Sequence, residues 1–242
     1  MMSTTRITHG LDDCSSRDFY AKPTMFQVMC KVDPIEDVCA WYEGVKGAFP
    51  KIVGKLRGLL QSSVDFDKVK DRDILNAQIG SVTMSHVHEG KTFSILLFRN
   101  GKLKISGGFP VALIELNEKD GYESYITSVV KKIKVLCRER DDVNDMNVTC
   151  VNGQFHHKVF SDLKRLEHAI GKMRSVFHHI KYPENDHPGR RGAFKLYLYK
   201  DKKTHVAMDI RGKAQIFGCK SIGELFHIFE MFEKEKEIFY VA

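Results

Sequence analysis

An Asn-Gly pair that follows a hydrophobic run predicts a β-hairpin in the first half of the chain. Residues 95–98 read Ile-Leu-Leu-Phe, Asn100-Gly101 follows one residue later, and the pattern then alternates. Asn-Gly tolerates the positive φ angles of a type I′ turn, which predicts that turn type here. Alternation places Leu103 and Ile105 on one face of the second strand. The opposite face carries Lys102, Lys104 and Ser106. One side of the hairpin is therefore core, and the other is a basic surface that bears a hydroxyl group.

The same pattern returns in the second half of the chain. Residues 212–218 share G-K-x-x-I-x-G with residues 101–107, at an offset of 212 − 101 = 111 residues. Hydrophobic residues that recur every three or four positions predict helices after Asp33-Pro34, over 121–137, after Ser161 and over 221–239. Alternating segments predict strands at 26–32, 81–87, 92–98, 148–150, 177–182, 194–199 and 204–210. These landmarks agree in order and spacing, which predicts an α+β fold of two β-α-β4-α repeats.

The repeat sets the expected domain organisation. Residues 1–22 are polar and of mixed charge, and we expect a flexible leader there. Residues 23–140 form the first repeat and residues 141–242 the second. A charged stretch around residues 138–145 lacks hydrophobic periodicity and is expected to link them.

Composition points to an intracellular protein with an acidic partner. The sequence has no run of 18 apolar residues and no apolar signal segment near its start. Its six cysteines are scattered without a C-x-x-C pair, which is typical of reduced thiols. The formal net charge of +7 makes nucleic acid the first candidate partner, with a lysine-rich solvated surface as the alternative.

No motif supports catalysis or a cofactor. The sequence lacks a P-loop, G-x-G-x-x-G, H-E-x-x-H and G-x-S-x-G, so we expect no enzyme activity. Histidine pairs invite a metal interpretation, and His86 and His88 share a strand face. No third ligand of suitable spacing accompanies them, so we expect neither a metal nor a cofactor.

The hairpin resembles a motif of the TATA-box-binding protein (TBP) family, whose repeats carry L-I-F-x-S-G-K-x-x-x-T-G-A-K. The first copy here reads Leu-Leu-Phe-Arg-Asn-Gly-Lys over residues 96–102 and Ser-Gly-Gly over 106–108. The second reads Ile-Arg-Gly-Lys over 210–213 and Phe-Gly-Cys-Lys over 217–220. Residues 177–182 resemble the family's F-P-G-L-I-Y segment. The resemblance covers roughly residues 26–239 at low identity, as in the divergent versions found in large DNA viruses.

The resemblance implies a saddle, in which two pseudo-symmetric repeats form one curved antiparallel sheet with helices on the convex face. The concave face would lie on the minor groove of A·T-rich promoter DNA, and phenylalanine wedges would kink the duplex. The implied function is a transcription initiation factor that recruits transcription factors or RNA polymerase subunits and does not engage membranes. The implied location is the host nucleus or a cytoplasmic viral factory.

Carried over residue by residue, the family pattern is only partly present. The wedge positions match Phe98 and Phe177, while their partner positions hold Asp209 and either Gly80 or Ser81. The phosphate-side lysines match Lys102, Lys213 and Lys220, whereas Phe109 replaces a fourth. On the groove floor, Lys104 and Gln215 replace valines, Ser106 replaces a threonine, and Phe217 is a bulky substitute. The central amides could come from Gln27 with Asn147 or Asn152.

Each of these assignments has a structural alternative. Phe98 could be an ordinary packing residue of the hairpin, and the lysines could serve solubility alone. Phe217 could turn into the core if its strand bulges. A carboxylate at Asp209 would face phosphates or base edges and weaken binding there. Asp209 and the altered floor also support a second hypothesis, a saddle-shaped interaction scaffold that has lost TATA recognition. A third is a nucleic-acid-binding module of another process.

Overall fold

One antiparallel sheet organises the chain. The structure is a computed structural model, and it describes residues 21–57, 63–68, 76–116, 118–139, 144–183 and 192–239. Within these ranges, eleven strands form one sheet in the order β3-β2-β4-β5-β6-β1-β7-β11-β10-β9-β8. Every paired neighbour runs antiparallel. The predicted leader lies outside the described residues as far as residue 20, and β1 already begins at Lys22.

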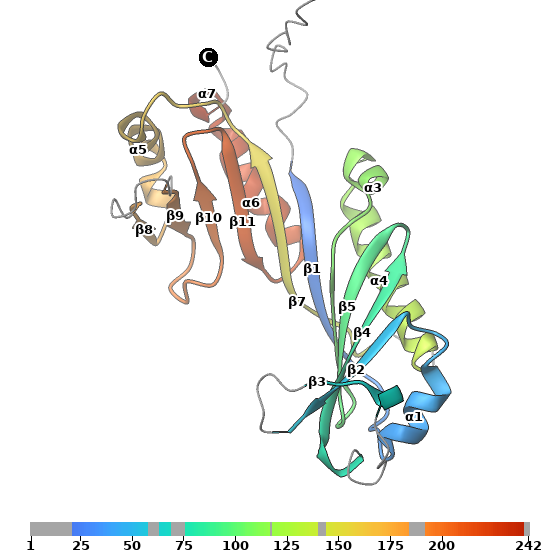
Figure 1. Cartoon of the computed structure of the whole chain (residues 1–242). Coiled ribbons are helices and arrows are strands. Elements are labelled where there is room, and N and C mark those ends of the chain that lie inside the picture. The colour runs from blue at the N-terminus through green and yellow to red at the C-terminus, as the bar shows by residue number, and fades with distance from the viewer. Residues whose placement is uncertain are drawn as a thin grey trace, which may run out of the picture.

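The sheet divides at its central pair, β1 and β7. The strands on one side are β1 (Lys22–Lys31), β2 (Lys51–Leu56), β3 (Ser63–Val64), β4 (Ile79–His88), β5 (Lys91–Phe98) and β6 (Lys102–Gly107). Those on the other are β7 (Asn147–His156), β8 (His179–Lys181), β9 (Phe194–Tyr197), β10 (His205–Met208) and β11 (Lys213–Cys219). Figure 1 shows the second half face-on and the first half turned away from it, because the sheet is strongly twisted.

Helices cover one face of this sheet. They are α1 (Val38–Val45), α3 (Val111–Leu116), α4 (Lys119–Leu136), α5 (Leu163–Lys172), α6 (Ile222–Lys234) and α7 (Lys236–Phe239), with single 3-10 turns at η1 (Phe66–Lys68) and η2 (Arg174–Val176). The predicted α+β class is confirmed: a large curved antiparallel sheet packs against several helices (Figure 1). None of the described helices is both long enough and apolar enough to span a membrane.

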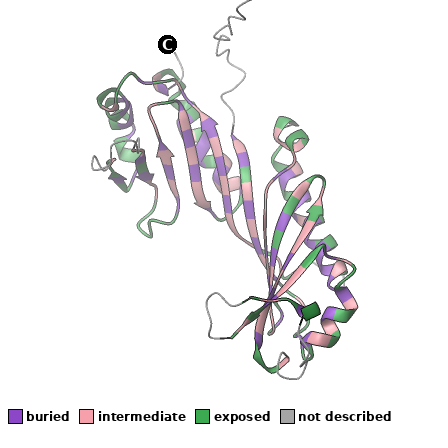
Figure 2. Cartoon of the chain, in the orientation of Figure 1, coloured by how far each residue is buried: buried purple, intermediate pink, exposed green. Residues whose placement is uncertain are grey.

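The core lies between the sheet and these helices. Phe26 of β1 is fully buried, with its ring centroid 5.1 Å from that of Phe109 and 6.4 Å from that of Tyr125 on α4. In the second half, Phe155 of β7 lies 5.0 Å from Phe232 of α6. Burial alternates along the strands, so buried and half-buried residues follow each other in Figure 2. The face without helices is therefore open.

The first helix begins later than the sequence predicts. Asp33 and Pro34 do not start it, because the Val32 and Ile35 backbone N–H groups donate to hairpin carbonyls at Gly101 and Arg99, each at 2.9 Å. These bonds hold residues 32–35 against the hairpin loop. Asp37 then caps α1, where its Oδ1 accepts from the Cys39 and Ala40 N–H groups.

The hairpin turn is also different from the prediction. A type I′ turn needs positive φ at both central residues, but only Gly101 of the Asn100-Gly101 pair has it, at φ 80°. The Gly101 N–H donates to the Phe98 carbonyl at 2.9 Å, which closes a three-residue loop that ends in a left-handed glycine. Positive φ at two successive residues occurs instead at Glu89 and Gly90, between β4 and β5.

The closing helix is broken rather than continuous over 221–239. Ser221 caps α6 through a hydrogen bond from the Glu224 N–H to Ser221 Oγ at 3.0 Å. The helix ends at Lys234, Glu235 intervenes, and the short α7 follows. The break lets Phe239 fold back into the core, where it is fully buried and lies 5.7 Å from Phe232.

We expect the fold to lose stability as the pH falls below about 6.5, the ordinary histidine pKa. His157 is buried against Phe160 and Phe239, and this burial lowers the pKa of its imidazole. Below the ordinary histidine pKa, the unfolded chain binds a proton at His157 that the folded chain does not bind. The stability that is present above this pKa is therefore lost as the pH falls to the lower pKa of the folded state. Urea midpoints at pH 7.5 and 5.5 should differ less in His157→Phe than in the native chain; an equal difference would contradict this assignment.

Candidate nucleic-acid interface

The open face of the central strands is polar and basic. On β6, the side chains of Lys102, Lys104 and Ser106 alternate with the fully buried Leu103 and Ile105, as the sequence predicts. In the register with β1, they stand opposite Lys31, Met29 and Gln27. Cations therefore gather toward one end of this strand pair, and uncharged polar groups toward the other.

Hydrogen-bonded amides and hydroxyls occupy the middle of the sheet. Gln27 Nε2 donates to Ser106 Oγ at 3.2 Å, and Thr149 Oγ1 of β7 donates to the Gln27 carbonyl at 3.2 Å. Asn152 Oδ1 accepts from the Gly218 N–H at 3.0 Å and from Cys150 Sγ at 3.3 Å. Of the predicted central amides, Gln27 and Asn152 are thus held in fixed positions on this face.

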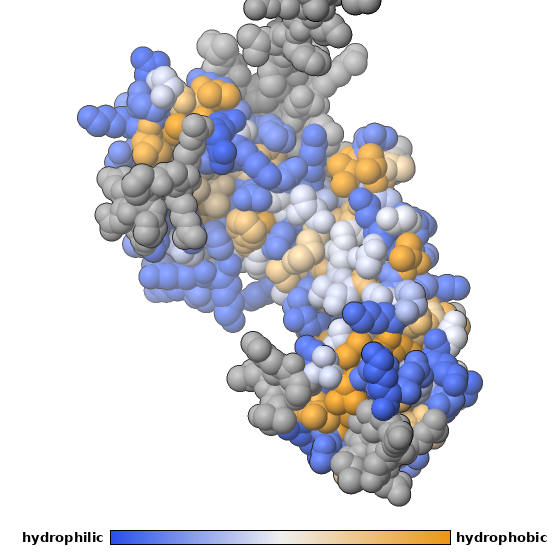
Figure 3. All heavy atoms as spheres, in the orientation of Figure 1, coloured by the Kyte–Doolittle hydropathy of each residue, from blue (hydrophilic) through white to orange (hydrophobic). Residues whose placement is uncertain are grey.

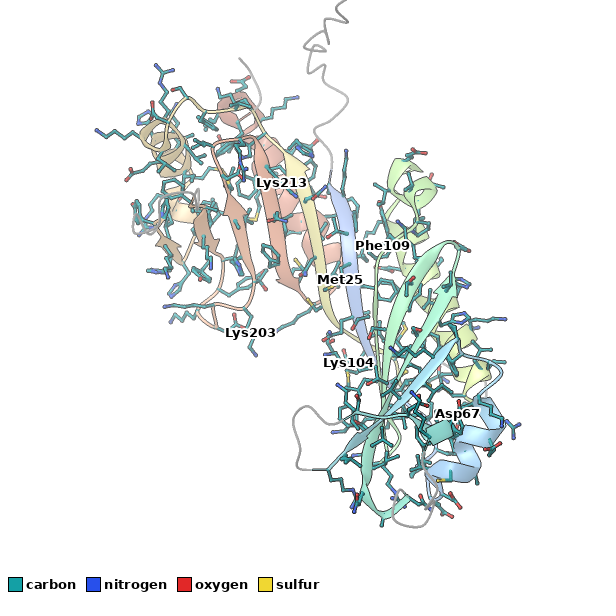
Figure 4. All side chains as sticks on the ribbon, in the orientation of Figure 1. Met25, Asp67, Lys104, Phe109, Lys203 and Lys213 are labelled. Carbon is teal, nitrogen blue, oxygen red and sulfur yellow. The ribbon has the colours of Figure 1, made fainter. Side chains whose placement is uncertain are left out.

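Lys213, Gln215 and Phe217 line the same face on β11. They alternate with Ala214 and Ile216, which are fully buried. Lys213 and Gln215 pair in register with His156 and Gln154 of β7. The predicted sets on β6 and β11 thus flank the central pair β1 and β7. Figure 4 labels Lys104 and Lys213 among these strands.

The carboxylate of Asp209 is already paired. Arg211 Nη2 lies 2.9 Å from Asp209 Oδ2, and the Arg211 backbone N–H donates to Asp209 Oδ1 at 2.9 Å. An adjacent guanidinium offsets the negative charge at the tip of the β10–β11 hairpin. Repulsion of phosphates at this tip is therefore smaller than an isolated carboxylate would cause.

Phe98 lies at the end of β5, half-buried and opposite Ser81 of β4. Its ring lines a shallow hollow of ≈ 490 Å³ together with Pro34, Ile35 and Gly80. Arg57, Arg99 and Asn100 also line the hollow, and Phe98 is only half-buried, so part of its side chain is accessible from outside. In Figure 3, the lower part of the molecule around β2 and β3 also carries a hydrophobic patch.

Phe177 occupies a different environment. It is 6% exposed, and its ring centroid lies 6.0 Å from that of Phe232 on the helix-covered side. Insertion of this ring into DNA would require it to leave the core. The two predicted wedge residues are therefore not equivalent in this structure.

Two further positions named from the sequence, Lys220 and Phe109, lie outside the open strands. Lys220 follows the end of β11, exposed, and its backbone N–H donates to Glu224 Oε2 at 2.7 Å. Phe109, which replaces a phosphate-side lysine of the family pattern, is 1% exposed and lies within the core cluster. Phe217 stays on the open face although β11 does bulge between Ile216 and Cys219.

Three further residues of this face are not among the site residues predicted from the sequence: His179, Tyr197 and His205. They stand in register with one another and with Phe217 across β8, β9, β10 and β11. The available signal is an aromatic or imidazole ring at an alternating position of each short strand. That signal identifies a surface only once the strand order is known.

The histidine pair of β4 lies on the helix-covered side. The His86 ring packs near Phe49 at 6.2 Å, and His88 lies 5.8 Å from Tyr125 of α4. Burial lowers the pKa of His86, and the neighbouring His88 adds to this effect. Within the described ranges, no three His, Cys, Asp or Glu side chains come together as metal ligands would.

Comparisons with known proteins find similarity to solved structures but no match by sequence. No protein-family model matches the sequence, and no curated protein matches it. Among solved structures, the TBP of Methanococcus jannaschii is similar over 90% of this chain and 97% of its own, with 15% sequence identity and a TM-score of 0.48. At this identity and TM-score, the similarity does not assign a family.

Proposed function

We propose that the open face of the sheet binds the minor groove of A·T-rich double-stranded DNA, as a TBP-like transcription initiation factor would. One observation carries the proposal. The four central strands present lysines on β6 and β11 at the flanks, with uncharged amides and hydroxyls between them, and helices cover the opposite face.

This arrangement suits a minor groove chemically. Lysines at the flanks can neutralise phosphates, which supplies most of the sequence-independent affinity. Side-chain amides such as those of Gln27 and Asn152 carry N–H groups that can donate to the acceptors that A·T pairs display in that groove. A twisted sheet also offers a wide curved surface, so many such contacts can form at once.

The proposal includes a two-repeat saddle. From β1 the sheet continues outward as β6-β5-β4-β2, and from β7 it continues as β11-β10-β9-β8. A pseudo-two-fold axis between β1 and β7 would therefore relate residues 23–140 to residues 141–242. Recruitment of transcription factors or polymerase subunits would then use surfaces away from the open face. Phe98 would supply a wedge at one end only.

The double substitution Lys102→Ala/Lys104→Ala tests the binding surface. We expect roughly tenfold weaker binding to an A·T-rich duplex, and a log–log salt slope about 2 units less steep, because two cationic contacts with the polyanionic duplex are lost. Fluorescence anisotropy titrations at several salt concentrations measure both quantities. A G·C-rich duplex of the same length reports selectivity.

The matched control is Lys131→Ala/Lys132→Ala, which removes the same charge from exposed positions on α4. This variant should retain most of the affinity. Equal losses in both variants would show that net charge alone drives binding. No binding by the native protein at low salt would overturn the proposal and favour the interaction scaffold.

A further inference from the structure

A row of four rings crosses the open face of the second half. The rings belong to His179, Tyr197, His205 and Phe217, one from each of β8, β9, β10 and β11. Successive centroids are 5.8, 5.2 and 5.1 Å apart, and successive planes are inclined by 30°, 39° and 26°. We name this set the ring row.

The rings overlap only in part. Their centroid separations exceed the roughly 3.5 Å of direct face-to-face contact, so neighbouring rings are not fully stacked on one another. Two of the inclinations, 30° and 26°, fall within the roughly 10–35° of twist between adjacent strands, and the third, 39°, is slightly larger. His179 is exposed and the other three are half-buried, so ring surface remains available to a ligand.

A second row runs beside the ring row, two residues away on each strand. It consists of Lys181, Lys195, Ala207 and Gln215, which pair across the same four strands. Two residues of strand correspond to about 6.6 Å. None of these four described strands contains a carboxylate. Aromatic surface and positive charge therefore lie side by side, and the small Ala207 stands between Lys195 and Gln215 in the second row.

The first half does not carry this feature. Ser106 follows Gly101 by five residues, as Phe217 follows Gly212, so Ser106 is the equivalent position in the first half. The strand register extends from Ser106 across the neighbouring strands. It reads Ser106, Ser94, Ser85 and Lys51. Because the same sheet positions tolerate serines, the rings of the second half are not a requirement of the fold.

We propose that the ring row binds unpaired nucleobases of single-stranded nucleic acid by stacking, while Lys181 and Lys195 hold the phosphates. Single-strand binding sites commonly combine stacking rings with a positively charged track for the backbone. The activity goes beyond duplex binding and does not rest on the proposed minor-groove function. DNA and RNA share the chemistry that the rings recognise.

The test uses fluorescein-labelled oligothymidylate, oligouridylate and an abasic deoxyribose-phosphate oligomer, each about twelve residues long to span such a site. These probes form no duplex, and the abasic oligomer carries the charge without the bases. Anisotropy titrations compare the native protein with two variants. Tyr197→Leu/Phe217→Leu removes two rings, and Tyr197→Phe/Phe217→Tyr keeps both.

We expect the ring-free variant to bind oligothymidylate at least about fivefold more weakly, and the ring-retaining variant to stay within about twofold of the native protein. The native protein should bind the abasic oligomer several-fold more weakly than either base-containing probe. The ratio of the thymidylate and uridylate affinities identifies the preferred strand.

Equal binding of the abasic and base-containing oligomers by the native protein would overturn the inference, whether or not the variants fold. Unchanged affinity in the folded ring-free variant would do so too. Loss of thymidylate binding in the ring-free variant, with unchanged binding of the abasic oligomer, would support base stacking on the ring row. Failure of the native protein to bind duplexes, with thymidylate binding retained, would reject only the minor-groove proposal.

Discussion

Replacing Phe177 with alanine is expected to lower the free energy of unfolding by about 3 kcal/mol, within the range for a buried phenylalanine. The side chain is 6% exposed and packs against Phe232 of α6. Phe232 in turn lies 5.0 Å from Phe155 of β7, so the cavity would open beneath the centre of the second half. Urea denaturation followed by circular dichroism measures the change.

The matched substitution Phe98→Ala should cost little stability and should weaken DNA binding instead. Phe98 is half-buried at the rim of a shallow hollow, so we expect a stability loss of only about 1 kcal/mol. The variant should bind duplex DNA more weakly and should bend it less. Anisotropy measures the affinity, and energy transfer between dyes at the duplex ends measures the bend. A large stability loss without a change in bending would make Phe98 a packing residue of the hairpin.

Segments with strong local signals could be predicted from the sequence. Periodic hydrophobic residues predict a helix at 121–137, close to α4, because a single buried stripe against a sheet imposes a period of 3.6. Alternation around Gly101 separates Leu103 and Ile105 from Lys102 and Lys104 correctly. In both cases, neighbouring residues carry the whole signal.

Features set by distant contacts could not be predicted in this way. The start of α1 at Val38, not after Asp33, depends on hydrogen bonds between residues 32–35 and a hairpin more than 60 residues away. Phe177 directly follows the 3-10 turn η2, so no alternating pattern indicates which face its ring takes. The ring row needs the register of four strands, and only Phe217 could be singled out in advance.

Replacing Gly101 with alanine should destabilise the fold by at least about 2 kcal/mol, since a left-handed backbone is costly for any residue with a Cβ. Gly101 has φ 80°, and an added Cβ would collide with the Val32 carbonyl oxygen. The Gly101 carbonyl also accepts the Val32 N–H at 2.9 Å, so the collision would disturb the bond that holds residues 32–35 to the hairpin. Chemical denaturation measures the loss.

Gly90→Ala separates the two causes. Gly90 has a similar φ of 72°, but an added Cβ there would meet no atom within 4 Å. This variant should therefore show the backbone cost alone, about 1 kcal/mol. The additional loss of stability in Gly101→Ala then measures the cost of the collision with the Val32 carbonyl, which directly follows β1. If both variants lose the same stability, the contact with Val32 contributes nothing, and Gly101 is required only for its backbone conformation. If Gly101→Ala loses more, the glycine of the repeated G-K-x-x-I-x-G motif also serves to dock its hairpin against the end of the central strand.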